Sequence, residues 1–240
     1  MSLPAQVQLA RDDLRNHLDR FDWAGQTARR LEILQTFLKL ATTEGYSSVT
    51  MRRLARAIGV KASSIYFHFP AGRDEIVTES LRWHYYEWGT AIVDAVDQCD
   101  SAREVWDAMV RVHLTRQLSL PESDLWDILV AMDRIGRFLP DQIREEIDLW
   151  LHLFPHMYEA AAHEMGYRNC DTAVHVVVAV LDSASSWCKR SADQHDLVIQ
   201  VKQAIAITHA LLSSHAQSIS TPAPGAKRSR GRKVPNRTPE

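Results

Sequence analysis

The stretch VTMRRLARAIGVKASSIYFHFPAGRDEIV, residues 49–77, decides the fold. Thr50 is a good N-cap for a first helix, because its hydroxyl can accept a hydrogen bond from a free N–H of the first turn. Gly59 predicts the end of that helix, since glycine readily adopts the left-handed conformation found after a helix C-terminus. A second helix follows, with Ile65 and Phe69 on one face. Two short helices joined by a tight turn form a helix-turn-helix, whose second helix enters the major groove of DNA.

The second helix, predicted over 62–69, carries basic, hydroxyl and aromatic side chains on its outer face. Aromatic rings on so short a polar face are unfavourable in water unless a partner covers them, and a DNA backbone is such a partner. The candidate DNA-binding residues are Thr50, Arg52, Arg53, Lys61, Ala62, Ser63, Ser64, Tyr66, Phe67 and His68. A helical hairpin without DNA is the alternative, but the turn glycine, N-cap, charge and aromatic residues all agree with DNA binding.

These residues also carry a resemblance to a known family. The pattern Thr50-x-x-x-Leu54-Ala55-x-x-x-Gly59-Val60, followed by Ile65-Tyr66-x-His68-Phe69-Pro70, resembles the signature of the TetR (tetracycline-repressor) family of bacterial regulators. The resemblance is specific over about 27–81. It implies that Tyr66 and His68 hold DNA phosphates, and that neighbouring side chains can reach bases, namely Arg52, Ser63, Ser64 and Phe67.

The sequence departs from the family pattern in two places. Lys61 stands where a capping serine is usual, so the second helix either begins one residue later or places Lys61 on a phosphate. The linker Ala71-Gly72-Arg73 is one residue longer than the commonest form. Neither departure threatens the fold, but both affect which side chains reach individual bases.

Charge is divided unevenly along the chain, although the formal net charge is only −2. Residues 27–74 contain eight basic and three acidic side chains, whereas residues 75–218 contain eleven basic and twenty-two acidic ones. A basic segment attached to an acidic remainder is typical of a DNA-binding head on a body that does not bind DNA.

The predicted fold is all-α: an N-terminal three-helix helix-turn-helix DNA-binding domain, then a larger C-terminal helical domain for ligand binding and dimerisation. Four parts are predicted along the chain. They are an extra amphipathic helix within 1–26, the DNA-binding domain over 27–74, the helical effector-binding and dimerisation domain over 75–218, and a disordered basic tail over 219–240.

The last two long helices, predicted over 171–190 and 193–218, are more apolar than one shallow core requires. We therefore expect a two-fold symmetric homodimer through them. Burial inside one large bundle is the alternative. A dimer also suits a palindromic operator, because two recognition helices must lie about 34 Å apart to read one face of DNA.

The larger domain is rich in aromatic residues and methionine, which suit an apolar ligand pocket as well as an ordinary core. Because the resemblance implies a small-molecule effector here, we expect a largely apolar or acyl-type effector whose binding releases DNA, as a repressor requires. The candidate ligand-binding residues are Trp106, Met109, His113, Trp126, Met132, Phe154, Met157, Tyr158 and Trp187.

Three alternative functions remain open at this point. His152, His156, Glu159 and His163 fall on one helical face and are weak candidates for a metal sensor. A helical enzyme is the second alternative, but no catalytic motif and no cofactor-binding motif occurs, so we expect no catalytic residue and no cofactor. A constitutive architectural DNA-binding protein would show no effector response.

Cysteine use and hydropathy indicate the compartment. Cys99, Cys170 and Cys188 are odd in number and widely spaced, which favours a reducing environment over a disulfide framework. No uninterrupted apolar run approaches the ~18 residues of a membrane span. We expect a cytoplasmic protein with no membrane partner.

Overall fold

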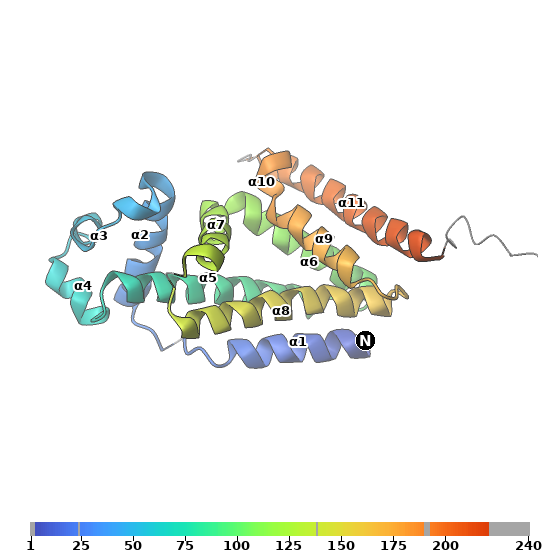
Figure 1. Cartoon of the computed structure of the whole chain (residues 1–240), viewed down its shortest axis with the longest axis horizontal. Helices are drawn as coiled ribbons and strands as arrows, with labels where there is room; N and C mark the ends of the chain where they lie inside the picture. Colours follow the sequence, from blue (N-terminus) through green and yellow to red (C-terminus); the bar gives the residue numbers. More distant parts are fainter. Residues whose placement is uncertain (1–2, 24, 138, 190–192, 221–240) are drawn as a thin grey trace, which may run out of the picture.

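The computed structural model describes residues 3–23, 25–137, 139–189 and 193–220. Every regular element in these ranges is a helix and none is a strand, so the all-α prediction is confirmed. The head consists of α2 (Ala28–Glu44), α3 (Met51–Ile58) and α4 (Ala62–His68), with a 3₁₀ turn at Tyr46–Ser48. Figure 1 shows the head at one end of the molecule, connected to the body by the long helix α5.

The body contains all the other described helices. In chain order they are α1 (Ala5–Leu18), α5 (Arg73–Val96), α6 (Ala102–Ser119), α7 (Pro121–Gly136), α8 (Asp141–Glu164), α9 (Asp171–Asp182), α10 (Ala184–Trp187) and α11 (Gln194–Ser220).

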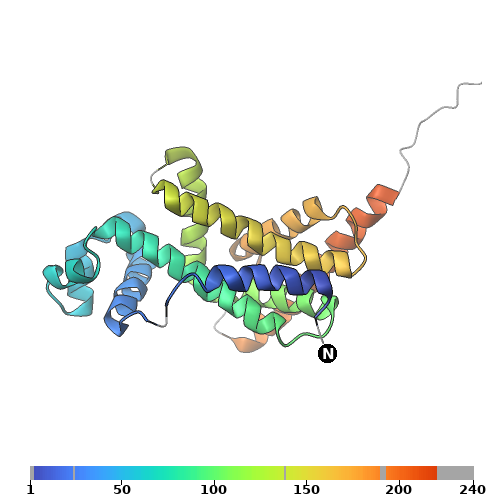
Figure 2. The same ribbon diagram turned by 90° about the horizontal axis from the view of Figure 1, so that it is seen from below.

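Helix α1 belongs to the body although it precedes the head in the chain. It packs along α8 and α5, as Figure 2 shows from below. Its apolar stripe is buried, including Val7 and Leu14, and Arg11 and Arg15 reach the carboxylate of Asp97 at the end of α5 (2.8 and 2.5 Å). The helix therefore reinforces the body and lies away from the recognition helix.

The head forms as its sequence predicts. Thr50 caps α3 by accepting a hydrogen bond from the backbone N–H of Arg53 (3.1 Å). Gly59 ends α3 in the left-handed region, with φ 75° and ψ 32°. Ile65 and Phe69 are fully buried, so the inward face predicted for the second helix is confirmed.

The helix predicted over 171–190 is wrong as one element, because it breaks at Ser183 into α9 and α10. Hydroxyl groups compete there with the helical backbone bonds: Ser183 donates to the carbonyl of Val180 (3.0 Å) and Ser186 to that of Ser183 (2.7 Å). At the other end of this region α11 continues to Ser220, two residues into the predicted tail, and the rest of that tail lies outside the described residues.

Helix α11 lies against α6 and α9 on one side of the body. Trp106 of α6 donates its indole N–H to Thr208 of α11 (3.1 Å), and His209 of α11 reaches Asp107 (2.7 Å). By length and composition alone, residues 194–214 are apolar enough to cross a membrane. Only 22% of this apolar stretch is buried against the rest of the body. The outer face of α11 is thus an exposed apolar surface.

Candidate functional site

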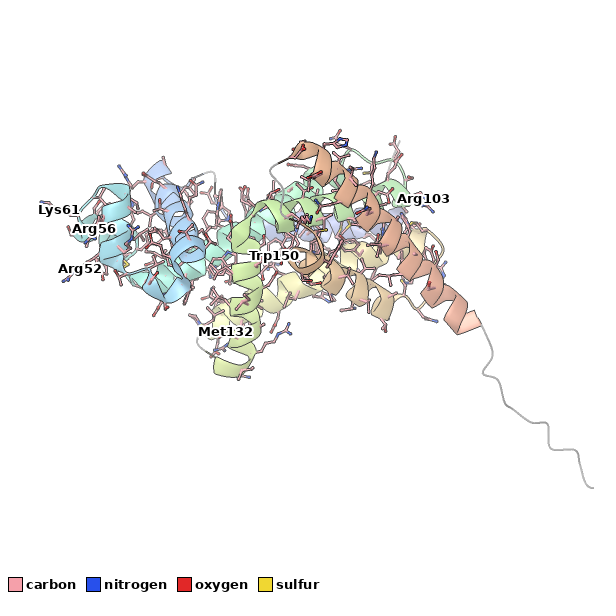
Figure 3. The ribbon with its side chains drawn as sticks, turned by 90° about the horizontal axis from the view of Figure 1, so that it is seen from above. Arg52, Arg56, Lys61, Arg103, Met132 and Trp150 are labelled. Carbon is pink, nitrogen blue, oxygen red and sulfur yellow. The ribbon has the colours of Figure 1, made fainter. Side chains whose placement is uncertain are left out.

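Three cations stand at the far end of the head. Figure 3 shows Arg52 and Arg56 of α3 together with Lys61, the residue before α4, at this tip. All three side chains are exposed, and no described residue forms a hydrogen bond or ion pair with them. Arg56 was not among the predicted DNA-binding residues, although its position four residues after Arg52 places both on one helical face.

The outer face of α4 carries the aromatic residues that the sequence predicts there. The side chain of Phe67 is 82% exposed, Tyr66 is exposed, and His68 lies edge-on to Phe67 with ring centroids 5.3 Å apart. Of the smaller side chains, Ser63 is exposed, whereas Ala62 and Ser64 are half-buried. No side chain caps α4 at Lys61, so the first departure from the family pattern leaves that ammonium group free.

Gly72 explains the longer linker. Its backbone has φ 78° and ψ −136°, a conformation that only glycine adopts readily. A Cβ atom at this position would lie 3.3 Å from the ring of Tyr66. The extra residue therefore lets the chain turn closely beneath Tyr66 and helps to fix the direction of its ring.

Two arginines point inward and hold α4 and α5 in place. Arg30 of α2 donates to the carbonyl of His68 (2.5 Å) and lies 4.2 Å from the ring centroid of Phe69. Arg73 at the start of α5 donates to the carbonyls of Val49 (3.1 Å) and Tyr46 (2.8 Å). These bonds fix the recognition helix to the rest of the head.

Arg53 differs from the cations at the tip because it already has a partner. Its Nε donates to Glu44 at the end of α2 (2.9 Å), and its Nη2 also bonds that carboxylate. The pair lowers the pKa of Glu44 and raises that of Arg53. Among the predicted DNA-binding residues, Arg53 and Thr50 thus have structural partners within the head.

Comparison with known proteins agrees with this geometry. Residues 33–79 match the family model described as bacterial regulatory proteins of the tetR family. The head is a TetR-family DNA-binding domain. The match spans α2, α3, α4 and the start of α5, the part of the chain that carries the sequence signature.

Solved structures of low sequence identity share the fold over most of this chain. A tetR-family regulatory protein from Rhodococcus RHA1 is 12% identical, with a TM-score of 0.64 over 78% of this chain and 97% of that one. The ketosteroid transcriptional regulator KstR2 of Mycobacterium tuberculosis is 19% identical, with a TM-score of 0.59 over 79% and 96%. A putative regulator from Saccharomonospora viridis in complex with choline is 19% identical, with a TM-score of 0.60 over 78% and 97%. No curated protein matches the sequence.

The body contains a small cavity walled by aromatic rings, which we call the aromatic cavity. Its volume is about 60 Å³. Tyr85 stacks on Trp150 (centroids 5.5 Å apart, 18° between planes), and Trp88 packs on Phe154 (4.5 Å). The lining residues are Tyr85, Trp88 and Gly89 of α5, Asp127 of α7, Trp150, Leu151, Phe154 and Pro155 of α8, and Val178 and Asp182 of α9.

A polar network behind the cavity holds its two carboxylates. The side-chain amide of Gln117 lies 2.9 Å from Asp127 Oδ2 and 2.8 Å from the backbone carbonyl of Asp182. His113 Nε2 lies 2.8 Å from Asp182 Oδ1, and the hydroxyl of Tyr158 lies 3.5 Å from His113 Nδ1. Burial and the neighbouring charge of Asp182 raise the pKa of Asp127 to about 6.

The predicted ligand-binding residues divide into three groups. Phe154 lines the cavity, and His113 and Tyr158 form the network behind it. Trp106, Met109, Trp126 and Met157 are buried in the closed core and do not line the cavity. The last two do not line the cavity: Met132 is 56% exposed on the part of α7 that projects from the body in Figure 3, and Trp187 is exposed on α10.

The main cavity residues that sequence reasoning missed are Tyr85, Trp88, Trp150, Asp127 and Asp182. A partial signal existed, because Tyr85 and Trp88 share a face of α5, as do Trp150 and Phe154 on α8. Nothing in the sequence showed that α5 and α8 face each other here. The two aspartates come from α7 and α9, so only the tertiary structure brings them together.

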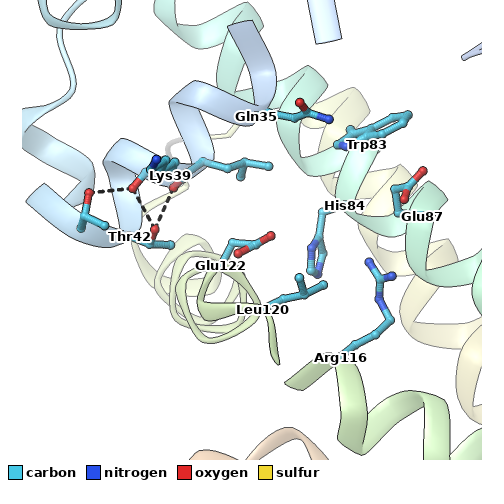
Figure 4. Close-up of a pocket in the computed structure, with 11 residues that line it drawn as sticks. Gln35, Lys39, Thr42, Trp83, His84, Glu87, Arg116, Leu120 and Glu122 are labelled. Carbon is cyan, nitrogen blue, oxygen red and sulfur yellow. Dashed lines mark hydrogen bonds between the residues drawn. The ribbon is translucent and has the colours of Figure 1, made fainter. Parts of the chain in front are cut away.

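A larger, open cleft separates the head from the body. Figure 4 shows its walls: α2 with Lys39 and Thr42, α5 with His84 and Glu87, and the α6–α7 region with Arg116, Leu120 and Glu122. Its volume is about 410 Å³. Burial and the charge of Arg116 lower the pKa of His84 to about 3, which keeps this imidazole neutral near pH 7. The cleft contains charges of both signs and lies where the head meets the body.

The row of candidate metal ligands is divided in the structure. The rings of His152 and His156 stack 5.9 Å apart, and His156 Nδ1 lies 3.6 Å from Glu159. His163 instead lies near Cys170 and Asp171, with ligand atoms within 4.8 Å of one another, the only such group among the described residues. A guanidinium nitrogen of Arg168 lies 3.3 Å from His163 Nδ1, and its positive charge opposes a metal ion there.

Proposed function

We propose that this protein is a cytoplasmic, ligand-responsive transcription regulator, a repressor that binds a palindromic operator as a dimer and is released by a small, largely apolar effector. One observation carries the proposal: a TetR-family domain ends in three unpartnered cations beside an exposed aromatic helix face. Free cations on one surface are the arrangement that DNA phosphates attract. In this proposal the chain has no catalytic role.

The roles within the recognition surface are those that the family resemblance implies. Tyr66 and His68 hold phosphates, and the free cations of the tip add sequence-independent attraction. Arg52, Ser63, Ser64 and Phe67 can reach bases, since an arginine can bond guanine bidentately and an apolar ring can contact a thymine methyl group. As one of the tip cations, Arg52 also contributes to the salt-dependent attraction. The inward-facing Arg30 supports this surface by fixing the end of α4.

Dimerisation through α9 and α11 is part of the proposal. Large apolar side chains on their outer faces are exposed in the single chain, including Val176 on α9 and Val198, Ile199 and Ile207 on α11. A second copy related by two-fold symmetry would cover them. A dimer interface would also account for the apolar composition of α11, which is long and apolar enough to cross a membrane.

Effector binding in the body is coupled to the head through two helices. The aromatic cavity is bounded by α5 and α7, and both of these helices also contact α2 of the head. A ligand that separates α5 from α7 would tilt the head, and the open cleft leaves room for that movement. The neighbour solved in complex with choline supports a small molecule as the effector of such a fold.

The proposal is tested by selecting bound genomic fragments and then measuring affinity by fluorescence anisotropy over a salt series. We expect salt-dependent binding of one preferred palindrome by a dimer. Tyr66→Ala or His68→Ala should weaken binding to all sequences, whereas substitutions of Ser64 or Phe67 should change the preferred sequence. A monomer in light scattering that ignores duplex DNA at low salt would refute the proposal.

A further inference from the structure

The walls of the aromatic cavity favour a positively charged guest. Tyr85, Trp88, Trp150 and Phe154 contribute rings from two facing helices. The faces of aromatic rings carry partial negative charge and attract ammonium groups, with tryptophan the strongest. Gly89 makes this arrangement possible, because a Cβ atom there would lie 2.7 Å from the ring of Trp150.

Two carboxylates face this aromatic space without a cation of their own. Within the described ranges, neither Asp127 nor Asp182 forms an ion pair with lysine or arginine. Gln117 bonds Oδ2 of Asp127, and His113 bonds Oδ1 of Asp182, so the second oxygen of each carboxylate has no bond from a described side chain. Asp127 is exposed and the side chain of Asp182 is 39% exposed, so a guest can reach both carboxylates from solvent. Two like charges near one another favour a cation that lies close to both.

The size of the cavity limits the guest. Its 60 Å³ is several times the ~10–15 Å³ that one water molecule needs, so it holds a group of a few non-hydrogen atoms. Leu151, 41% exposed, lines the same space and gives a substituent a way out to solvent. Pro155 has no N–H to donate to the carbonyl of Leu151, which leaves one more acceptor oxygen on this helix turn.

Other classes of ligand fit these walls less well. An anion, including the carboxylate of an acyl chain, would meet Asp127 and Asp182. A neutral apolar molecule would bury the two carboxylates without compensating their charge. A bare metal ion prefers a shell of oxygen, nitrogen or sulfur ligands, whereas most of this wall is carbon.

We propose that the aromatic cavity binds a small organic cation, an ammonium group with apolar substituents, held between the aromatic rings and the carboxylates of Asp127 and Asp182. This inference rests on the proposed function, because it names the chemical class of the effector. The effector remains largely apolar in its surface, and its single positive charge is the feature that the cavity selects.

Three ligands of similar shape test the charge of the guest. Tetramethylammonium, neopentyl alcohol and pivalate each carry methyl groups around one centre and differ in being positive, neutral and negative. Titration calorimetry on the full chain should show that tetramethylammonium binds, that the alcohol binds at least about tenfold more weakly, and that pivalate does not bind. Equal binding of the alcohol or of pivalate, or no binding of tetramethylammonium, overturns the inference.

Variants locate the site. Asp127→Asn and Trp88→Leu should each weaken tetramethylammonium binding at least about tenfold. The first removes a negative charge with almost no change of side-chain volume, and the second removes an aromatic ring. Asp94→Asn, which removes the same charge from an exposed position of α5 that does not line the cavity, is the matched control and should stay within about twofold. Unchanged binding by Asp127→Asn, with circular dichroism confirming the fold of all variants, would place the cation elsewhere.

A DNA-release assay separates this inference from the proposed function. If tetramethylammonium binds and needs Asp127 but the protein binds no duplex, the proposed function fails and the cation site stands. If the protein binds an operator that only neutral or anionic compounds release, and Asp127→Asn leaves that release unchanged, the inference fails and the proposed function stands.

Discussion

The head and the body use their charged side chains in opposite ways. In the head, Arg52, Arg56 and Lys61 point away from the protein and have no partner among the described residues. In the body, Asp127 and Asp182 line a small cavity between helices and remain reachable from solvent. A surface of unpaired cations suits a long polyanion that approaches from outside, whereas two carboxylates beside an aromatic cavity suit a small guest.

The two regions also differ in how their parts are assembled. The recognition surface comes from α3, α4 and the turn between them, all within residues 50–72. The aromatic cavity takes residues from four helices that are spread over almost one hundred positions of the chain, from Tyr85 to Asp182. The head can therefore stay intact when the body is altered.

The largest effect is expected from removing the free cations of the tip. Arg52→Ala, Arg56→Ala and Lys61→Ala together should lower DNA affinity by about a hundredfold or more and reduce the salt slope by about 2.7, because each phosphate contact contributes about 0.9. Tetramethylammonium binding should not change. The matched control removes three exposed cations of the body, Arg111, Lys189 and Lys202, and should leave the slope nearly unchanged. A similar loss in the control would mean that total charge, and not the tip, holds DNA.

A pair of glycine substitutions separates backbone requirements within the head. Gly72→Asn should reduce the free energy of unfolding by about 1–3 kcal/mol, because its backbone conformation excludes other residues. Gly59→Asn should change it by less than about 1 kcal/mol, since asparagine tolerates the left-handed helical region. Urea unfolding measures both. Equal values would show that the linker relaxes and does not fix Tyr66.

Gly89→Ala applies the same reasoning to the body. The new methyl group would lie 2.7 Å from the ring of Trp150 and 2.9 Å from Leu18. We expect about 1–3 kcal/mol of destabilisation from overpacking, although alanine is the better helix former, and loss of tetramethylammonium binding. Duplex binding without effector should be retained. A more stable protein that still binds the cation would show that Trp150 can move freely.

Much of the head could be predicted from sequence because its determinants are local. The N-cap at Thr50, the turn at Gly59 and the buried pair Ile65 and Phe69 all depend on residues within a few positions of one another. What the sequence did not show was the bond between Arg53 and Glu44, since the end of α2 meets the start of α3 only after the turn has folded.

The cavity was harder to predict because residue type alone does not distinguish a wall from a core. Met109 and Met157 are apolar and buried, yet they belong to the packed core and do not line the cavity. Met132 has the same chemistry but lies on the exposed face of α7. The useful signal was the pairing of aromatic residues with acidic ones, and this pairing arises only between helices distant in the sequence.

The body should respond to pH through Asp127. Because folded Asp127 holds its proton more tightly than an unfolded aspartate, its contribution to the free energy of unfolding falls as pH rises from 3.8 to about 6 and is constant above. Cation binding needs the ionised form, so affinity should fall below pH 6 by up to about tenfold per unit.

Several other groups surround Asp127 and set the background of that titration. Asp182 on α9, Asp124 and Arg134 on α7, Tyr85 on α5 and His113 on α6 all lie near it or interact with its neighbours. Calorimetry from pH 5 to pH 8 on wild type and Asp127→Asn isolates the part of the pH dependence of cation affinity that comes from Asp127. A pH profile that Asp127→Asn does not flatten would assign the dependence to one of these other groups.

The smallest effect is expected for Arg53, and it tests the comparison most closely because Arg52 is its neighbour in sequence. Arg53→Ala removes a guanidinium that Glu44 already holds, whereas Arg52→Ala removes one that is free. DNA affinity should therefore fall less for Arg53→Ala than for Arg52→Ala, and the salt slope should change by less than the ~0.9 of one phosphate contact. Glu44→Gln should free Arg53 and raise affinity slightly at low salt, an effect that disappears as screening increases. If Arg53→Ala lowers the salt slope as much as Arg52→Ala does, the ion pair between Arg53 and Glu44 opens when DNA binds. In that case, the absence of an ion-pair partner in the unbound head does not identify the side chains that contact phosphates.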